Sequence, residues 1–198
     1  MVTDVQGVER LRERDAQAFR FLIERLQQPI TGYLHRLVAD REVALDLAQD
    51  TFVQVYKEID KTSGEIALDA WIYRIATNYG LRYLNRKRLR PFVRLDNGES
   101  FDESLAVAGP EDQTETRILI MQALGTMKPM DAAVLQLHYG NGFTYEEIGE
   151  VMEMSSEAIR KRVARSVEKF RRVYGKKFPS TRPQPNKSSI KVTTKGVE

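Results

Sequence analysis

Two stretches with apolar residues at helical spacing flank a stretch that lacks this repeat. The middle stretch, residues 95–116, contains seven acidic residues and no basic residue, and it includes the turn-forming pairs Asn97-Gly98 and Gly109-Pro110. Apolar residues three and four positions apart predict amphipathic helices on either side of it. We therefore predict an all-α fold with two small helical domains joined by an acidic linker.

The domain boundaries follow from where this pattern stops. We expect a first helical domain over residues 1–92, a flexible linker over 93–113 and a second helical domain over 114–174. The remaining residues, 175–198, contain three prolines, several serines, six basic residues and one acidic residue. Such a composition cannot bury a core, so we predict a disordered basic tail.

The composition excludes several classes of chemistry. The 198 residues include no cysteine and two histidines, His35 and His138, which lie far apart in the sequence. A disulfide framework, a cysteine-ligated zinc site and a thiol nucleophile are therefore excluded. No apolar run approaches the roughly 20 residues of a membrane-spanning helix, and the first residues do not follow a signal-peptide pattern. We expect a cytoplasmic protein with no metal, no cofactor and no catalytic residue.

The formal net charge of +3 hides two strongly basic segments. Residues 71–94 contain seven basic residues and no acidic one, and residues 155–172 contain seven basic residues and two acidic ones. Two separate basic segments suggest two contacts with a polyanion. A basic segment can also be an ordinary solvated face, and charge alone leaves this alternative open.

The first domain begins with helices whose start signals are present in the sequence. Asp15 is suited to cap a helix that we expect Pro29 to break, with a new helix starting there. Asp40 opens a longer helix with a wide apolar stripe. Its opposite face is suited to contact another protein, although an ordinary solvated face is the alternative. The residues on this face are Asp46, Gln49, Asp50, Val53 and Gln54.

A further helix is expected from about Leu68, and its two faces differ in character. The core face carries Leu68, Ile72, Ile75 and Tyr79. The exposed face carries Arg74, Asn78, Arg82 and Asn85. Arginine suits phosphates and guanine edges, and asparagine suits adenine edges or unstacked bases. Aromatic side chains near these arginines and asparagines provide surfaces on which nucleic-acid bases can stack, a contact worth roughly 1–3 kcal/mol per base. These aromatic residues are Trp71, Tyr73, Tyr79 and Tyr83, of which we expect Tyr79 and Trp71 to belong to the core.

The second domain has the pattern of a helix-turn-helix. Thr144 and Glu147 form a capping box that opens a short helix, and Ser155 caps a second helix after a tight turn. The buried stripe of this second helix consists of Ile159, Val163, Val167 and Phe170. Its outer face carries Glu157, Arg160, Lys161, Ala164 and Arg165. A basic second helix of this kind suits the major groove of DNA, although helical hairpins in bundles look similar.

Three segments resemble one known family. The sequences DLAQDTF (46–52), WIYRIATN (71–78) and FTYEEIG (143–149) are similar to motifs of bacterial sigma factors of the extracytoplasmic-function (ECF) type, in the sigma-70 family. They occur in the family's order, and the resemblance covers roughly residues 10–175. It implies a protein that binds core RNA polymerase and directs promoter recognition, opening of the −10 element and transcription initiation.

The resemblance assigns roles to three groups of residues. Docking on the clamp helices of the largest polymerase subunit is implied for Asp46, Gln49, Asp50, Phe52 and Val53. Binding of the −10 element is implied for Arg74, Asn78, Arg82, Asn85, Arg86, Lys87 and Arg88, with a flipped base held beside the loop 61–68. Binding of the −35 element is implied for Ser156, Glu157, Arg160, Lys161, Arg162 and Arg165. Core polymerase and promoter DNA are the implied partners, an anti-sigma factor is a possible third, and no membrane insertion is expected.

The sequence departs from the family pattern at two informative positions. Arg82 stands where the family usually has aspartate, which affects the expected −10 preference. Glu153 stands where the family usually has glycine in the turn, so it has to tolerate that backbone. The rival hypothesis is a stand-alone regulator, in which a sensing or dimerisation domain is joined to a helix-turn-helix. An enzyme is the third class, and it has little support in the sequence.

Overall fold

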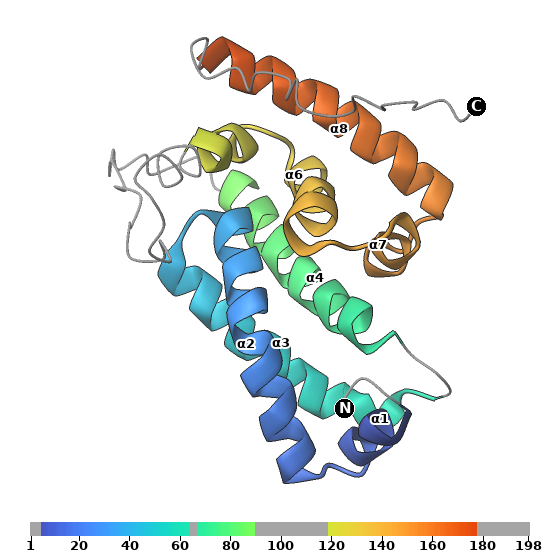
Figure 1. Ribbon diagram of the computed structural model, residues 1–198. Helices are drawn as coiled ribbons and strands as arrows, with labels where there is room; N and C mark the ends of the chain where they lie inside the picture. The colour runs from blue at the N-terminus through green and yellow to red at the C-terminus, as the bar shows by residue number, and fades with distance from the viewer. Residues whose placement is uncertain (1–4, 64–66, 90–118, 178–198) are drawn as a thin grey trace, which may run out of the picture.

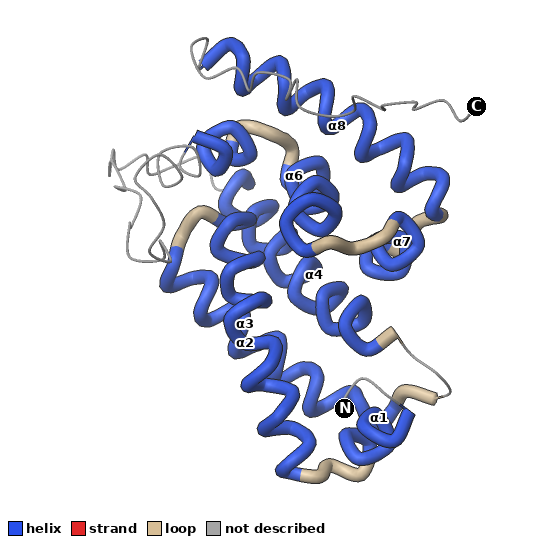
Figure 2. The backbone as a smooth tube through the Cα atoms, viewed as in Figure 1, coloured by secondary structure: helices blue, strands red, loops and turns tan. Residues whose placement is uncertain are grey.

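The computed structural model describes residues 5–63, 67–89 and 119–177, and within these ranges the chain forms helices and turns without any strand (Figure 2). The all-α prediction is confirmed. The helices of the first part are α1 (Val5–Arg12), α2 (Ala16–Val38), α3 (Arg41–Glu58), the 3-10 turn η1 (Ile59–Lys61) and α4 (Leu68–Leu89). The second part comprises helical residues 119–125, α6 (Pro129–Leu135), the π-helical turn η3 (Gln136–Gly140), α7 (Tyr145–Met152) and α8 (Ser156–Lys177).

Several predicted segments lie partly or wholly outside the described residues. The acidic linker over 93–113 lies outside them, and so does most of the tail. The first three residues of the predicted tail, 175–177, belong to α8, so this helix runs past the expected boundary at 174.

The predicted helix starts are present, and side chains satisfy the free backbone N–H groups there. Asp15 accepts hydrogen bonds from the N–H groups of Gln17 (2.8 Å) and Ala18 (3.1 Å). Asp40 accepts one from Val43 N–H at 3.0 Å. Because the first N–H groups of a helix have no partner within the helix, such side chains fix where each helix begins.

The predicted break at Pro29 is wrong. α2 is one helix of 23 residues with Pro29 inside it, on the exposed side. A proline in a helix interior costs about 3 kcal/mol. The apolar stripe of α2 continues on both sides of the proline, through Leu26 and Ile30, which are 5% and 0% exposed. Burying each such side chain gains about 1.5–3 kcal/mol, so tertiary packing outweighs the local penalty.

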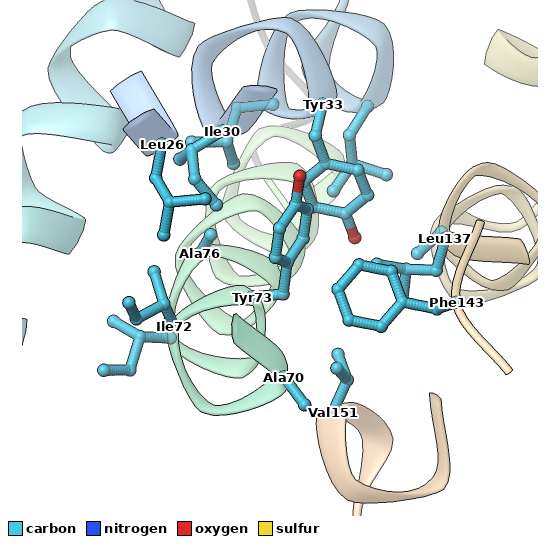
Figure 3. Packing of buried hydrophobic residues seen from close by; sticks show 14 of the residues in the cluster. Leu26, Ile30, Tyr33, Ala70, Ile72, Tyr73, Ala76, Leu137, Phe143 and Val151 are labelled. Atoms are coloured by element: carbon cyan, nitrogen blue, oxygen red, sulfur yellow. The ribbon is translucent and has the colours of Figure 1, made fainter. Parts of the chain in front are cut away.

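The two predicted domains share one apolar core. α4 lies between α2 and α3 on one side and α6 and α7 on the other, while α8 covers α6 and α7 (Figure 1). Three aromatic rings mark the junction: Tyr33 of α2, Tyr73 of α4 and Phe143, the residue two places before α7 (Figure 3). The Tyr33 and Tyr73 ring centroids are 5.4 Å apart, and those of Tyr73 and Phe143 are 4.8 Å apart. The second domain is therefore packed directly on α4.

Candidate polymerase and nucleic-acid interfaces

The polar face of α3 is exposed as the sequence predicted. Asp46, Gln49 and Asp50 are exposed, and Val53 is 44% exposed. Gln54, also expected on this face, is half-buried and donates a hydrogen bond to the Glu58 carboxylate at 2.7 Å. Phe52 is half-buried against the core. Residues three and four positions apart lie on one side of a helix, so these polar side chains and Val53 form a single surface.

A groove between α2 and α3 extends this surface. It has a volume of about 570 Å³ and is lined mostly by apolar side chains, including Ile23 of α2 and Leu45, Val53 and Tyr56 of α3. Ile23 lies in this groove and is 38% exposed, although it is an apolar residue at helical spacing. The sequence pattern did not predict this groove, because the apolar face of α2 is wider than the area that the neighbouring helices cover.

The polar face of α4 is open to solvent along most of its length. Asn78, Arg82 and Asn85 are exposed, and so are the cations of the last turns, Arg86, Lys87 and Arg88. Arg88 also donates a hydrogen bond to the carbonyl oxygen of Met127 at 3.3 Å. The predicted core residues Leu68, Ile72 and Ile75 are buried. The two faces of α4 divide as the periodicity predicted, except that Tyr79 and Trp71, both expected in the core, are half-buried against it.

Contacts with the second domain cover the beginning of this polar face. Arg74 is half-buried, and its guanidinium lies 3.4 Å from the carboxylate of Glu153 at the end of α7. Tyr73 was expected as accessible aromatic surface, and this expectation is wrong, because the residue is only 4% exposed. Its hydroxyl oxygen accepts a hydrogen bond from the side-chain amide of Asn141 at 2.9 Å. Burial raises the pKa of Tyr73 to about 12.

The helix-turn-helix is formed by α7 and α8. Thr144 and Glu147 make the predicted capping box: the Thr144 hydroxyl accepts from Glu147 N–H at 3.2 Å, and the Glu147 carboxylate accepts from Thr144 N–H at 2.8 Å. On α8, the predicted outer residues Glu157, Arg160, Lys161 and Arg165 are exposed. Glu157 and Lys161 form an ion pair of 2.7 Å across one helical turn.

The turn between α7 and α8 requires unusual backbone geometry. Glu153 adopts the left-handed conformation, with φ 54° and ψ 46°, so it tolerates the backbone for which the family usually has glycine. A Cβ added to Gly149 would lie 2.6 Å from the carbonyl oxygen of Met154, a distance that real side chains do not reach. Gly149 therefore allows the turn to approach α7 closely.

A buried carboxylate that the sequence did not reveal connects α6 to α8. Asp131 is 4% exposed, and its two oxygens bind Arg162 at 3.0 Å and Lys169 at 2.7 Å. Burial by itself would raise the pKa of Asp131, but the hydrogen bond and charge of Lys169, together with Arg162, lower it overall. Arg162, expected on the DNA-binding surface, is thus held against α6. Arg162 and Lys169 lie 31 and 38 residues beyond Asp131, so no local pattern connects them.

Both histidines have packing partners. His35 is buried. His138 stacks on the ring of Tyr145 at 4.7 Å, and its Nδ1 atom lies 2.9 Å from the carbonyl oxygen of Phe143. The part of the chain that the structure describes contains no cluster of three or more residues suited to hold a metal ion. In the same ranges, no helix has both the length and the apolar character needed to cross a membrane.

Comparison with known proteins places both halves of the chain in one family. Residues 22–90 match the family model for Sigma-70 region 2, and residues 123–172 match the model for Sigma-70, region 4. The ECF RNA polymerase sigma-E factor of Haemophilus influenzae is 28% identical over 176 residues, which cover 84% of this chain and 93% of that protein. The Escherichia coli (strain K12) protein of the same name is 28% identical over 176 residues, covering 84% and 92%.

Two solved structures share the fold. CnrH, solved in complex with the cytosolic domain of CnrY, is 20% identical with a TM-score of 0.64, covering 84% of this chain and 93% of that one. RpoE of Bartonella quintana, solved with the anti-sigma factor NepR, is 21% identical with a TM-score of 0.60, covering 78% and 95%. The two family models match in the expected order, over the helices that carry the α3 face, α4 and the helix-turn-helix. The chain therefore belongs to the sigma-70 family and is a sigma factor of the ECF type.

Proposed function

We propose that this protein is a dissociable specificity subunit of RNA polymerase that binds the core enzyme, recognises promoters at two elements and promotes opening at the −10 element. The observation that carries the proposal is the order of three surfaces on one chain: the polar face of α3, the basic face of α4 and the helix-turn-helix. A transcription factor of this kind acts in the cytoplasm together with polymerase, and it performs no catalysis itself.

The proposed polymerase contact is the α3 face, extended by the groove between α2 and α3. Exposed acidic residues at 46 and 50 provide charge, and Val53, Leu45 and Ile23 provide accessible apolar area beside them. Interfaces commonly combine an apolar centre with a polar rim. The clamp helices of the largest polymerase subunit are the proposed partner.

The proposed −10 contact is the exposed face of α4. Asn78 and Asn85 offer amides that can pair with base edges, and Arg82 with the cations at 86–88 offers charge for phosphates. Taking one base out of the stack costs a few kcal/mol, which contacts in a pocket can offset. On this proposal, Arg82 contributes phosphate binding where the family usually has an acidic side chain.

The packing of the second domain sets a condition for this contact. Tyr73 is covered by Phe143, and Arg74 is paired with Glu153. Tyr73 becomes available to DNA only after Phe143 has moved away, and the same movement frees the partly exposed Arg74 from Glu153. We therefore expect the free chain to bind promoter DNA weakly, and polymerase binding to accompany separation of the two domains.

The proposal is tested by reconstitution. Purified chain is added to core polymerase with genomic DNA, and the transcripts are sequenced. Initiation from a defined promoter set, absent without the chain, supports the proposal. No initiation from any promoter would refute it. A stand-alone regulator predicts another result: binding of duplex DNA as a dimer, and no retention on immobilised core polymerase.

A further inference from the structure

A basic cleft lies on the flank of α8 that faces α6. It has a volume of about 120 Å³ and is lined by Lys128, Asp131, Arg162, Arg165 and Lys169. Four cations and one carboxylate give this cleft a formal charge of 4 − 1 = +3. The volume is well above the roughly 10–15 Å³ that one water molecule needs, so the cleft admits a larger polar group.

The single carboxylate in the cleft is already satisfied. One oxygen of Asp131 accepts from Arg162 and the other from Lys169, at 3.0 Å and 2.7 Å. Asp131 thereby holds Arg162 and Lys169 in fixed positions, because a buried carboxylate without partners is costly. It also leaves no oxygen directed at an incoming anion.

Two further cations at the rim have no acidic partner among the described residues. Lys128 directly precedes α6, is exposed and makes no side-chain cap. Arg165 is exposed, and its Nε atom donates only to the carbonyl oxygen of Lys161 at 3.2 Å. The cleft thus combines cations held in position by Asp131 with cations that are available to a ligand.

We propose that Lys128, Arg165 and Lys169 form a binding site for one backbone phosphate of duplex DNA, and that Asp131 positions Lys169 within it. This inference rests on the proposed function, in which the neighbouring face of α8, with Arg160 and Lys161, enters the major groove at the −35 element. A strand of the duplex borders that groove, so its phosphates pass along the flank of the helix. Cations held in position before binding lose little conformational freedom when the phosphate arrives.

The site separates two tasks on α8. Phosphate contacts fix register and orientation without reading sequence, whereas base-edge contacts provide specificity. Lys128, Arg165 and Lys169 therefore contribute affinity on any duplex. Arg160 and Lys161 remain the candidates for sequence reading, and Arg162 serves as support for α8.

The test measures binding of holoenzyme, assembled from the full chain and core polymerase, to promoter DNA over a range of salt concentrations. Each phosphate contact adds about 0.9 to the slope of the logarithm of affinity against the logarithm of salt concentration. Lys128→Ala removes one of the three cations at that phosphate and is expected to reduce this slope by up to that amount, equally for an intact and a scrambled −35 element. Lys128→Arg is expected to restore it.

The matched control is Arg171→Ala. Arg171 is an exposed cation on α8, roughly 120–180° around the helix from the cleft residues at about 100° per residue, and its removal is expected to leave the slope unchanged. Thermal unfolding of each variant confirms that the fold is retained. The inference is overturned if Lys128→Ala leaves the slope unchanged, if its effect depends on the −35 sequence, or if Arg171→Ala has the same effect.

Two outcomes separate this inference from related ones. Binding of inorganic phosphate alone that depends on Lys128, with an unchanged slope on DNA, would assign the cleft to a free anion and overturn the inference. Failure of the unmodified chain to form a holoenzyme would refute the proposed function instead. Holoenzyme that binds promoters with an unaltered slope in Lys128→Ala refutes only the phosphate site.

Discussion

Replacing Glu153 by glycine is expected to stabilise the protein while it removes a contact between the two domains. The left-handed conformation of Glu153 costs a residue with a Cβ about 1–2 kcal/mol. Glycine avoids this cost, but about 0.5–1 kcal/mol of the gain is lost because glycine has greater conformational freedom in the unfolded chain. The ion pair with Arg74 at 3.4 Å, with side chains 36% and 75% exposed, contributes less than about 1 kcal/mol. The net gain is therefore about 0.5 kcal/mol.

Glu153→Ala is the control, because it loses the same ion pair and keeps the strained backbone. The glycine variant is expected to exceed the alanine variant by about 1 kcal/mol, which corresponds to about 2–4 °C in the melting temperature of a chain of this size. Ala39→Gly calibrates the backbone contribution, since Ala39 also has a left-handed backbone (φ 56°). Thermal unfolding followed by circular dichroism measures all of these differences. A glycine variant that melts at or below the alanine variant would refute the reasoning.

Three further changes test other parts of the structure. Gly149→Ala places a methyl group 2.6 Å from a backbone oxygen, so it is expected to destabilise the fold by about 1–2 kcal/mol in chemical denaturation. Gly175→Ala is the control, because the space around Gly175 is open, and it is expected to stabilise α8 by up to about 1 kcal/mol. Asp131→Asn leaves Arg162 and Lys169 without a charged partner and is expected to cost about 2 kcal/mol at pH 7. The folded-state pKa of Asp131 is lowered, so its contribution is complete above the unfolded value of about 4 and is lost as pH falls from there through the folded-state pKa. The two proteins should therefore converge in acid, and a stability difference that stays constant down to about pH 2 would contradict the assignment. Asp50→Ala is expected to weaken binding to core polymerase about tenfold in a pull-down titration without changing the melting temperature. Glu24 is an exposed acidic residue that does not line the groove, so Glu24→Ala should leave polymerase binding unchanged.

Local signals in the sequence were sufficient for most of the helices and for the faces that they expose. Asp15, Asp40 and the pair Thr144 and Glu147 cap the helices that they were predicted to open. The exposed faces of α3 and α8 match expectation because side chains that lack tertiary partners follow the helical period alone. The assignment of Asp46, Asp50 and the other site residues to polymerase and DNA remains a prediction.

The features that the sequence did not reveal all depend on contacts between distant residues. Pro29 obeys a local rule that the packing of Leu26 and Ile30 overrides. Asp131 has an ordinary position near a helix start, and only the fold brings Arg162 and Lys169 to it. Periodicity within one helix cannot reveal which later segment covers it.

Tyr73 is buried by residues of the second domain, which its own helix could not reveal, and this burial bears on the proposed mechanism. Its ring packs on Phe143, and its hydroxyl oxygen accepts a hydrogen bond from Asn141, so the second domain satisfies both its apolar and its polar character. A net hydrogen bond is worth about 0.5–1.5 kcal/mol, and an aromatic pair adds about 0.5–1.5 kcal/mol beyond its buried area. These two contacts of Tyr73 together favour the packed arrangement by about 1–3 kcal/mol, in addition to the apolar area buried across the junction. On the proposed mechanism, binding to polymerase has to supply at least the sum of both. The same residues can therefore be buried in the free chain and become available in the holoenzyme.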